Sequence, residues 1–274
     1  MTDLHVDAGG TSLAGEQAGD GPPVVLLHGL TATRRYVVMG SRVLERDGHR
    51  VIAYDARGHG RSSPAPTPEA YCYDGLAADL LAVLDATGVD RGVLAGASMG
   101  AHTLLAFALA HPERVAGLVA ITPAFDPEDD RPDRLERWDR LSDGLRAGGV
   151  DGFLAAYGEP DVPERYEETI RTVLRQRLSA HEHPDALADA LRAVPRSRPF
   201  AAWADLAALD VPATVVVSRD EADPEHPYAT GERYAGAIAG AELRTEEPGR
   251  SPLAWQGGQL SKIIAETARR VRVL

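Results

Sequence analysis

Short apolar runs that end at Gly, Asp, Ser or Pro recur along the chain from Pro22. Runs of this kind, rich in leucine and β-branched residues, are typical of strands that are buried on both faces of a parallel sheet. Between them, apolar residues recur at helical spacing, as from Leu76 to Leu84 and from Leu104 to Ala108. The pattern therefore predicts an open α/β sheet. The predicted strands lie in PPVVLLHG, HRVIAYDARGHG, RGVLAGASMG, RVAGLVAITPAF and VPATVVVSRDEAD.

The alternation of strand and helix stops between about residues 126 and 209. This stretch has no strand pattern and contains amphipathic segments around Leu135–Leu145, Ile170–Leu178 and Leu187–Val194. We expect a helical cap at 126–209, inserted into a core made of residues 1–125 and 210–274. Because ligands of open α/β sheets bind at the carboxyl ends of the strands, we expect the cap to lie over that edge.

Composition limits the partners of the protein. The chain of 274 residues has 29 basic and 41 acidic residues and a net charge of −12, which argues against nucleic acid. Its one cysteine, Cys72, cannot form an internal disulfide, and the N-terminal residues do not resemble a secretory signal. No apolar run approaches the roughly 18 residues of a membrane span. We expect a cytoplasmic protein that acts on a small molecule without membrane contact; the sequence does not indicate its oligomeric state.

A sharp strand-to-helix turn is predicted at Ser98. The sequence Gly96-Ala97-Ser98-Met99-Gly100 follows a predicted strand and precedes a predicted helix. Glycines two residues to either side relieve the crowding at such a turn, which raises the serine hydroxyl above the edge of the sheet. Ser98 is therefore the candidate nucleophile.

Two further segments agree with this turn. LLHGL follows the first of the predicted strands, and YDARGHGRSS, Tyr54 to Ser63, follows the next. With the Gly-x-Ser-x-Gly turn, they make the chain resemble the α/β-hydrolase superfamily from about Val24 to Ala265. The resemblance implies a mostly parallel eight-stranded sheet with helices on both faces, a Ser-Asp-His site and no cofactor. It also implies an oxyanion hole formed by the backbone N–H groups of Leu30 and Met99.

The resemblance places the catalytic acid after the strand that contains VPATVVVS. The following SRDEADPEHP offers several carboxylates, of which Asp223 fits the family's Asp-Pro loop better than Asp220 does. Asp126 is a lesser alternative, because some relatives carry the acid after the preceding strand.

The position expected for the catalytic histidine contains an arginine. The loop before the last helix has Gly249-Arg250-Ser251 where the family commonly has Gly-His-Ser, and no histidine follows His226. A guanidinium does not release its proton near neutral pH, so Arg250 cannot serve as the base for Ser98. Arg250 could form a buried ion pair with Asp223 or bind a substrate carboxylate or enolate.

Other histidines are candidates for the missing base. His226 is three residues after Asp223 and ranks first. His102, one helical turn after Ser98, ranks second. Two further histidines in the expected cap, His181 and His183, rank lower, and their spacing without further ligands does not support a metal site. The remaining candidates, His28 and His59, lie in segments where histidine usually stabilises loops.

Three functions remain open from the sequence. The first is hydrolysis of a small ester, thioester or lactone by Ser98 with a non-standard base. The second is a non-hydrolytic lyase, cyclase or elimination reaction that uses the oxyanion hole and Arg250. The third is an inactive member that binds a ligand in the capped pocket. The substrate itself cannot be read from the residues, because the cap that shapes the pocket lies outside the resemblance.

Overall fold

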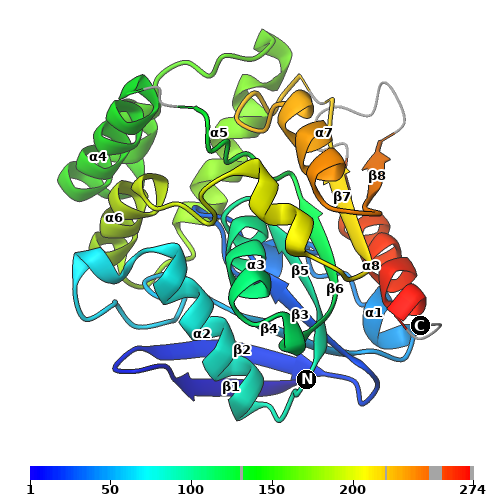
Figure 1. Cartoon of the computed structure of the whole chain (residues 1–274). Helices are drawn as coiled ribbons and strands as arrows, with labels where there is room; N and C mark the ends of the chain where they lie inside the picture. The colour runs from blue at the N-terminus through cyan, green and yellow to red at the C-terminus, as the bar shows by residue number, and fades with distance from the viewer. Residues whose placement is uncertain (130–131, 220, 247–254, 272–274) are drawn as a thin grey trace.

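The fold is centred on one sheet of eight strands in the order β1-β2-β4-β3-β5-β6-β7-β8. Figure 1 shows the computed structural model of the chain, which describes residues 1–129, 132–219, 221–246 and 255–271. The strands are β1 Thr2–Asp7, β2 Ser12–Ala18, β3 Pro23–Leu27, β4 Arg50–Tyr54, β5 Gly92–Ala97, β6 Val115–Ile121, β7 Ala213–Val217 and β8 Glu242–Thr245.

The sheet is parallel from β4 to β8 and antiparallel at β1 and β2. In the central strands Val25 of β3 lies opposite Ile52 of β4 and Leu94 of β5, and all three side chains are buried. These runs are apolar throughout because both faces of the sheet are covered. The prediction of a mostly parallel eight-stranded sheet is confirmed.

Helices cover both faces of the sheet (Figure 1). Apolar side chains of α2, α3 and α7 pack on one face, and those of α1 and α8 pack on the other. The helices are α1 Val43–Arg46, α2 Tyr73–Ala86, α3 Met99–Ala110, α4 Pro132–Tyr157, α5 Glu164–Leu178, α6 Pro184–Ala193, α7 Tyr228–Ala237 and α8 Gly257–Val271.

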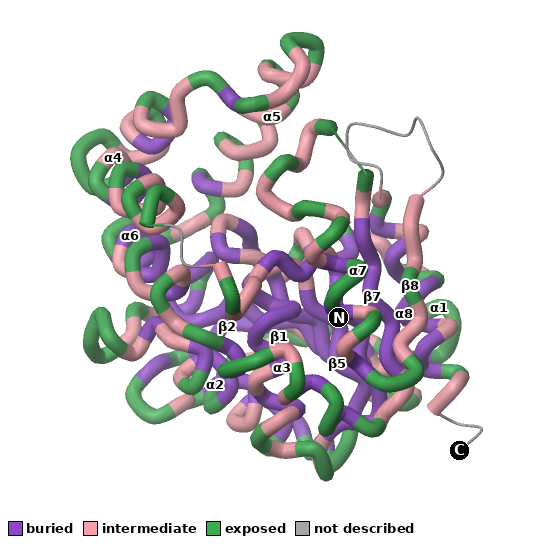
Figure 2. The backbone as a smooth tube through the Cα atoms, turned by 45° about the horizontal axis from the view of Figure 1, so that its top comes forward, coloured by how far each residue is buried: buried purple, intermediate pink, exposed green. Residues whose placement is uncertain are grey.

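Three of these helices, α4 to α6, lie between β6 and β7 in the chain and form one side of the molecule (Figures 1 and 2). Helix α4 is kinked at Gly149, whose φ of 58° favours glycine. Buried leucines of α4 and α6 share one apolar cluster with Leu30 and Met99. The inserted helices, α4–α6, are thus packed against the loops at the carboxyl ends of the strands.

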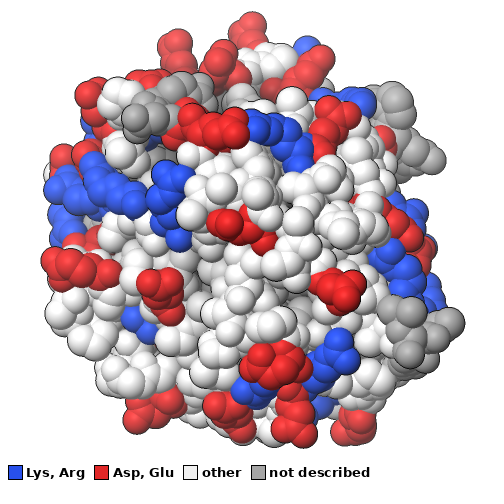
Figure 3. All heavy atoms as spheres, in the orientation of Figure 1, with Lys and Arg blue, Asp and Glu red and all other residues white. Residues whose placement is uncertain are grey.

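The surface of the inserted helices carries paired charges. Arg146 lies next to Asp189, and Arg192 is 2.6 Å from Asp143. Figure 3 shows basic side chains beside acidic ones over this part of the molecule. No helix within the described ranges combines the length and apolar character needed to cross a bilayer.

Candidate functional site

Ser98 lies at a strained turn between β5 and α3. Its φ is 52° and its ψ is −113°, a combination that is costly for a residue with a side chain. A Cβ atom at Gly100 would lie 2.2 Å from the carbonyl oxygen of Leu27, and one at Gly96 would lie 2.4 Å from the backbone of Gly100. Only glycine fits at these two positions, which is why the turn can be so tight. The turn places the Ser98 hydroxyl at the carboxyl edge of the sheet.

His226 connects Ser98 to Asp223. Its Nε2 lies 2.9 Å from the Ser98 hydroxyl oxygen, and its Nδ1 lies 2.7 Å from a carboxylate oxygen of Asp223. The carboxylate can only accept, so Nδ1 carries a proton that it donates to Asp223. In the neutral ring Nε2 is then free to accept the proton of the Ser98 hydroxyl. The three side chains form a continuous hydrogen-bonded chain.

Both His226 and Asp223 come from the loop that joins β7 to α7. Pro224 directly follows Asp223, and Pro227 directly follows His226. The two prolines restrict the backbone on either side of Glu225-His226. The intervening Glu225 forms an ion pair with Arg137 of α4. The loop is therefore held by its own sequence and by a contact with the inserted helices.

The charges of the pair shift both pKa values. Burial disfavours the charged form of His226, but the Asp223 carboxylate, its hydrogen bond and Glu225 together raise the pKa of His226 above its ordinary 6.5. Burial also opposes the charge of Asp223, yet the nearby His226 and Arg177 lower the pKa of this carboxyl. The exposed fractions of the two side chains are 21% and 38%, so solvent reaches the pair.

The loop that contains Leu30 lies against the turn at Ser98. A Cβ atom at Gly29 would be 3.5 Å from the Cβ of Ser98. Below it, Nε2 of His59 is 2.7 Å from the carbonyl oxygen of Leu30, which fixes the orientation of that peptide. Met99 is the first residue of α3, and the N–H groups of a first helical turn have no partner within the helix. Both candidate oxyanion donors thus come from backbone beside Ser98.

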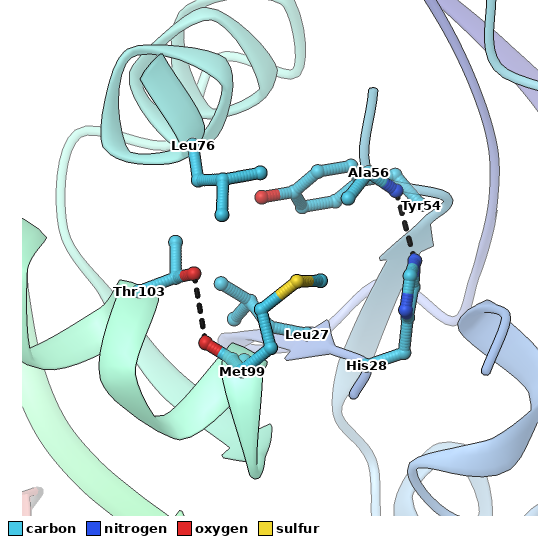
Figure 4. Close-up of a pocket in the computed structure, with 8 residues that line it drawn as sticks. Leu27, His28, Tyr54, Ala56, Leu76, Met99 and Thr103 are labelled. Atoms are coloured by element: carbon cyan, nitrogen blue, oxygen red, sulfur yellow. Dashed lines mark hydrogen bonds between the residues drawn. The ribbon is translucent and has the colours of Figure 1, made fainter. Parts of the chain in front are cut away.

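A small cavity is lined in part by His28 and Met99 (Figure 4), and Ser98 is not among its lining residues. Its volume is about 10 Å³, enough for no more than a water molecule. The Met99 side chain points into it between Leu76 and Leu27, and His28 accepts the N–H of Ala56 at its side. The cavity is too small to hold a substrate.

His102 is occupied by other partners. Its Nε2 accepts the backbone N–H groups of Ala124 and Phe125, each at 3.0 Å, and its Nδ1 lies 2.9 Å from the Tyr73 hydroxyl. Burial and the charge of His226 lower the pKa of His102 to about 3. The ring is a neutral packing residue behind the site, and it has no hydrogen bond to the Ser98 hydroxyl.

The remaining candidates from the sequence lie elsewhere. Asp126 is bound to Arg233 and Trp203, away from His226. His181 accepts the N–H of Gly60 and so fastens the segment after α5 to the loop after β4. No cluster of three or more metal-ligating side chains occurs in the part of the chain that the structure describes. His183 precedes α6 at its N-terminus, whereas Asp220 and Arg250 lie outside the described residues.

One residue near the site was not identified from the sequence. Arg177, in the last turn of α5, lies close enough to Asp223 and His226 for its charge to affect both pKa values. The helix also contains Arg175, two positions earlier, on the outside of the protein. Nothing in the sequence distinguishes one arginine from the other.

Comparison with known proteins agrees with the fold. Residues 22–163, just over half of the chain, match the family profile described as alpha/beta hydrolase fold. A hydrolase of Pseudomonas putida, 2-hydroxy-6-oxononadienedioate/2-hydroxy-6-oxononatrienedioate hydrolase 2, is 32% identical over 80% of this chain and 78% of its own length. Epoxide hydrolase B of Mycobacterium tuberculosis is 39% identical, but over only 38% of this chain and 30% of that protein.

Solved structures resemble the whole chain. A thermophilic esterase from Thermogutta terrifontis, studied with malate bound, superposes with a TM-score of 0.78 at 28% identity, over 99% of both chains. Est816, described as an N-acyl homoserine lactone degrading enzyme, has a TM-score of 0.72 at 25% identity, covering 99% of this chain and all of Est816. The two sequence relatives are described as hydrolases, and the two solved structures as an esterase and a lactone degrading enzyme.

Proposed function

The chain belongs to the alpha/beta hydrolase fold family, and from this premise we propose that it is a serine hydrolase of a small carboxylic ester, thioester or lactone. The observation that carries the proposal is the contact of 2.9 Å between the Ser98 hydroxyl and Nε2 of His226. A serine beside an imidazole that is itself oriented by a carboxylate is the arrangement that activates a hydroxyl for attack. The base thus comes from the acid's own loop, and no histidine is required at position 250.

The proposed reaction proceeds through an acyl-enzyme. His226 Nε2 takes the hydroxyl proton while the Ser98 oxygen attacks the acyl carbon, and the carbonyl oxygen gains the negative charge. The same proton passes from His226 to the leaving alcohol, thiol or ring oxygen as its bond to the acyl carbon breaks. Water then attacks the ester of Ser98, again giving a proton to His226, and the free acid leaves when Ser98 regains its hydrogen.

The remaining parts of the site support this chemistry. The backbone N–H groups of Leu30 and Met99 are proposed to bind the developing oxyanion, a role that costs no rearrangement when the groups are fixed beforehand. Asp223 keeps the proton of His226 on Nδ1 and stabilises the ring when it becomes charged. The inserted helices are proposed to act as a cap over this site. We further propose that the protein acts in the cytoplasm.

The sequence-based alternatives are weaker for the same geometric reason. An inactive binding protein would not need the contact between Ser98 and His226, and a lyase or cyclase would not need a serine placed to form an acyl-enzyme. The relatives described as a dioate hydrolase, an esterase and a lactone degrading enzyme favour hydrolysis as well. Arg250 retains its two proposed roles, binding of Asp223 or of a substrate anion, since it lies outside the described residues.

Labelling with a fluorophosphonate tests the nucleophile. We expect one covalent adduct on the native protein by intact-mass measurement, because the activated Ser98 oxygen displaces fluoride from phosphorus. Ser98→Ala should abolish the adduct, whereas Ser218→Ala, a serine of the adjacent loop, should retain it. An unlabelled native protein, or an adduct that persists in Ser98→Ala, would refute the proposed nucleophile.

The pH dependence of kcat/KM tests the base. A protonated imidazole cannot accept the Ser98 proton, so kcat/KM should fall as the pH drops through the pKa of His226, and this acid limb should lie above pH 6.5. Glu225→Gln removes one of the charges that raise this pKa and should move the limb to lower pH. Glu221→Gln, whose carboxylate pairs with Arg165 instead, should leave the limb in place. An acid limb below pH 6 in the native enzyme would contradict the assignment.

A further inference from the structure

Arg177, in the last turn of α5, has no hydrogen-bonded acidic partner among the residues that the structure describes. Its Nε is buried and has no hydrogen-bond partner. Over the described ranges 1–129, 132–219, 221–246 and 255–271, its guanidinium forms neither a hydrogen bond nor an ion pair. The flat group lies over the ring of Tyr36, with 5.3 Å between its carbon atom and the ring centre. Aromatic contact of this kind supports a guanidinium but does not satisfy its N–H donors.

The other three arginines of α5 each have a hydrogen-bond partner. Arg165 binds Glu221 at 2.8 Å, Arg171 donates to the carbonyl oxygen of Gly158 at 2.6 Å, and Arg175 binds Asp151 at 2.6 Å. Each of them is satisfied at or near the surface. Arg177 alone among the four arginines of this helix has a buried Nε and no such contact within the described residues.

The position of Arg177 relates it to the proposed catalytic residues. Its positive charge lowers the pKa of both Asp223 and His226, so it lies within electrostatic reach of each. The carboxylate of Asp223 nevertheless forms its ion pair with His226. Tyr36, beneath the guanidinium, is six residues after Leu30 in the loop that follows β3. Arg177 therefore lies on the side of α5 that faces the loop after β3 and the loop of Asp223 and His226.

Burial without a partner is unfavourable for this charge. Loss of water lowers the pKa of Arg177, against weaker effects of Tyr36 and Asp223 in the other direction. A guanidinium nevertheless remains protonated in proteins, so the charge persists and its N–H donors stay available. Such an arrangement is stabilised when a ligand supplies the missing acceptor.

We propose that Arg177 binds a carboxylate on the substrate, remote from the bond that is cleaved. This inference rests on the proposed function and specifies its substrate class: monoesters or lactones that carry a second, free carboxylate on the acyl side. The planar fork of a guanidinium matches the two oxygens of a carboxylate. A singly charged group is favoured over a phosphate dianion, because the carboxylate of Asp223 lies nearby and repels additional negative charge.

Paired chromogenic substrates test the preference. The mono-4-nitrophenyl esters of succinate, glutarate and adipate are compared with the neutral 4-nitrophenyl esters of butyrate, valerate and hexanoate. For at least one chain length, kcat/KM of the native enzyme should favour the acidic ester. Arg177→Gln should lower that ratio roughly 10- to 100-fold, the effect of removing one charge-assisted hydrogen-bonded contact. Arg177→Lys should retain part of the preference, since it keeps the charge but loses the fork.

Arg175→Gln is the matched control, because it removes an arginine from the same helical turn whose partner is Asp151. This variant should keep the native ratio. Equal rates on acidic and neutral esters at every chain length would overturn the inference, as would an equal loss on both in Arg177→Gln. Neither outcome would affect the proposed serine chemistry.

Binding without turnover separates the two proposals. Calorimetry with Ser98→Ala and adipate, glutarate or succinate should detect binding that is lost in Ser98→Ala/Arg177→Gln and kept in Ser98→Ala/Arg175→Gln. If this pattern is found while the native protein hydrolyses no ester, the carboxylate site stands and the proposed hydrolysis fails. If no dicarboxylate binds while the esters are hydrolysed without regard to charge, the carboxylate site fails.

Discussion

His226→Ala is expected to lower kcat for ester hydrolysis by a factor between about 10⁴ and 10⁶, because the variant has no group that can take the proton of Ser98. His226 is the imidazole that contacts the Ser98 hydroxyl in the structure. The residual rate should come from the backbone donors and from binding alone, so KM should change little. Steady-state kinetics on the best ester of the paired series, with pre-steady-state measurement of acylation, would give both values.

Two controls make the result specific. His5→Ala replaces an exposed histidine of β1 and should retain native kcat. Asp223→Asn should give a loss of about 10⁴, since it keeps the shape of the loop but no longer holds the correct ring tautomer. If His226→Ala kept a tenth or more of the native kcat, another group would be accepting the Ser98 proton, and the assignment of His226 as the base would be wrong.

The sequence predicted the sheet well because burial on both faces produces continuous apolar runs. β3, β4, β5, β6 and β7 all lie in such runs, and each is covered on both sides by helices. The hairpin β1–β2 was not located from the pattern and followed only from the family resemblance. Four of the six residues of β1 are exposed, so this edge lacks the apolar signal of the centre.

The position of the base could not be predicted from spacing. Family resemblance places the histidine after the last strand, where this chain has Arg250. By sequence His226 is the first of the alternatives, but residues three apart in a loop face one another only if the backbone folds back between them. In this chain the path through Pro224 and the contact of Glu225 with Arg137 on a distant helix determine that fold. Such a long-range contact leaves no local pattern.

The place of Arg177 next to the proposed site could not be predicted from the sequence either. Along the chain it is one of several arginines in a polar helix, and a solvated helix face is the ordinary reading of such a segment. Its burial depends on how α5 approaches the loop that carries Tyr36. Packing between segments that are far apart in the sequence, rather than residue type, makes this arginine distinctive.

Asp79→Ala is expected to destabilise the protein by about 3–5 kcal/mol, because it leaves the buried charge of Arg57 without its partner. Arg57 belongs to the loop after β4 and donates to both carboxylate oxygens of Asp79, at 2.8 and 2.7 Å. It also donates to the carbonyl oxygens of Ala70 and Gly75. The exposed fraction of the Asp79 side chain is 0%, so water cannot replace the lost carboxylate in the variant.

The second aspartate–arginine pair of α2 provides the control. Asp85 lies 2.7 Å from Arg114, but its side chain is 60% exposed, and Asp85→Ala should cost no more than about 1 kcal/mol. Urea unfolding of the native protein and both variants gives the comparison, with the midpoint expected to shift and the slope expected to stay constant. Arg57→Met/Asp79→Leu should recover much of the loss, because it removes the unpaired charge together with its partner. If Asp79→Ala and Asp85→Ala destabilised the protein equally, burial would not be the cause, and the loop after β4 would have to be anchored by its other contacts.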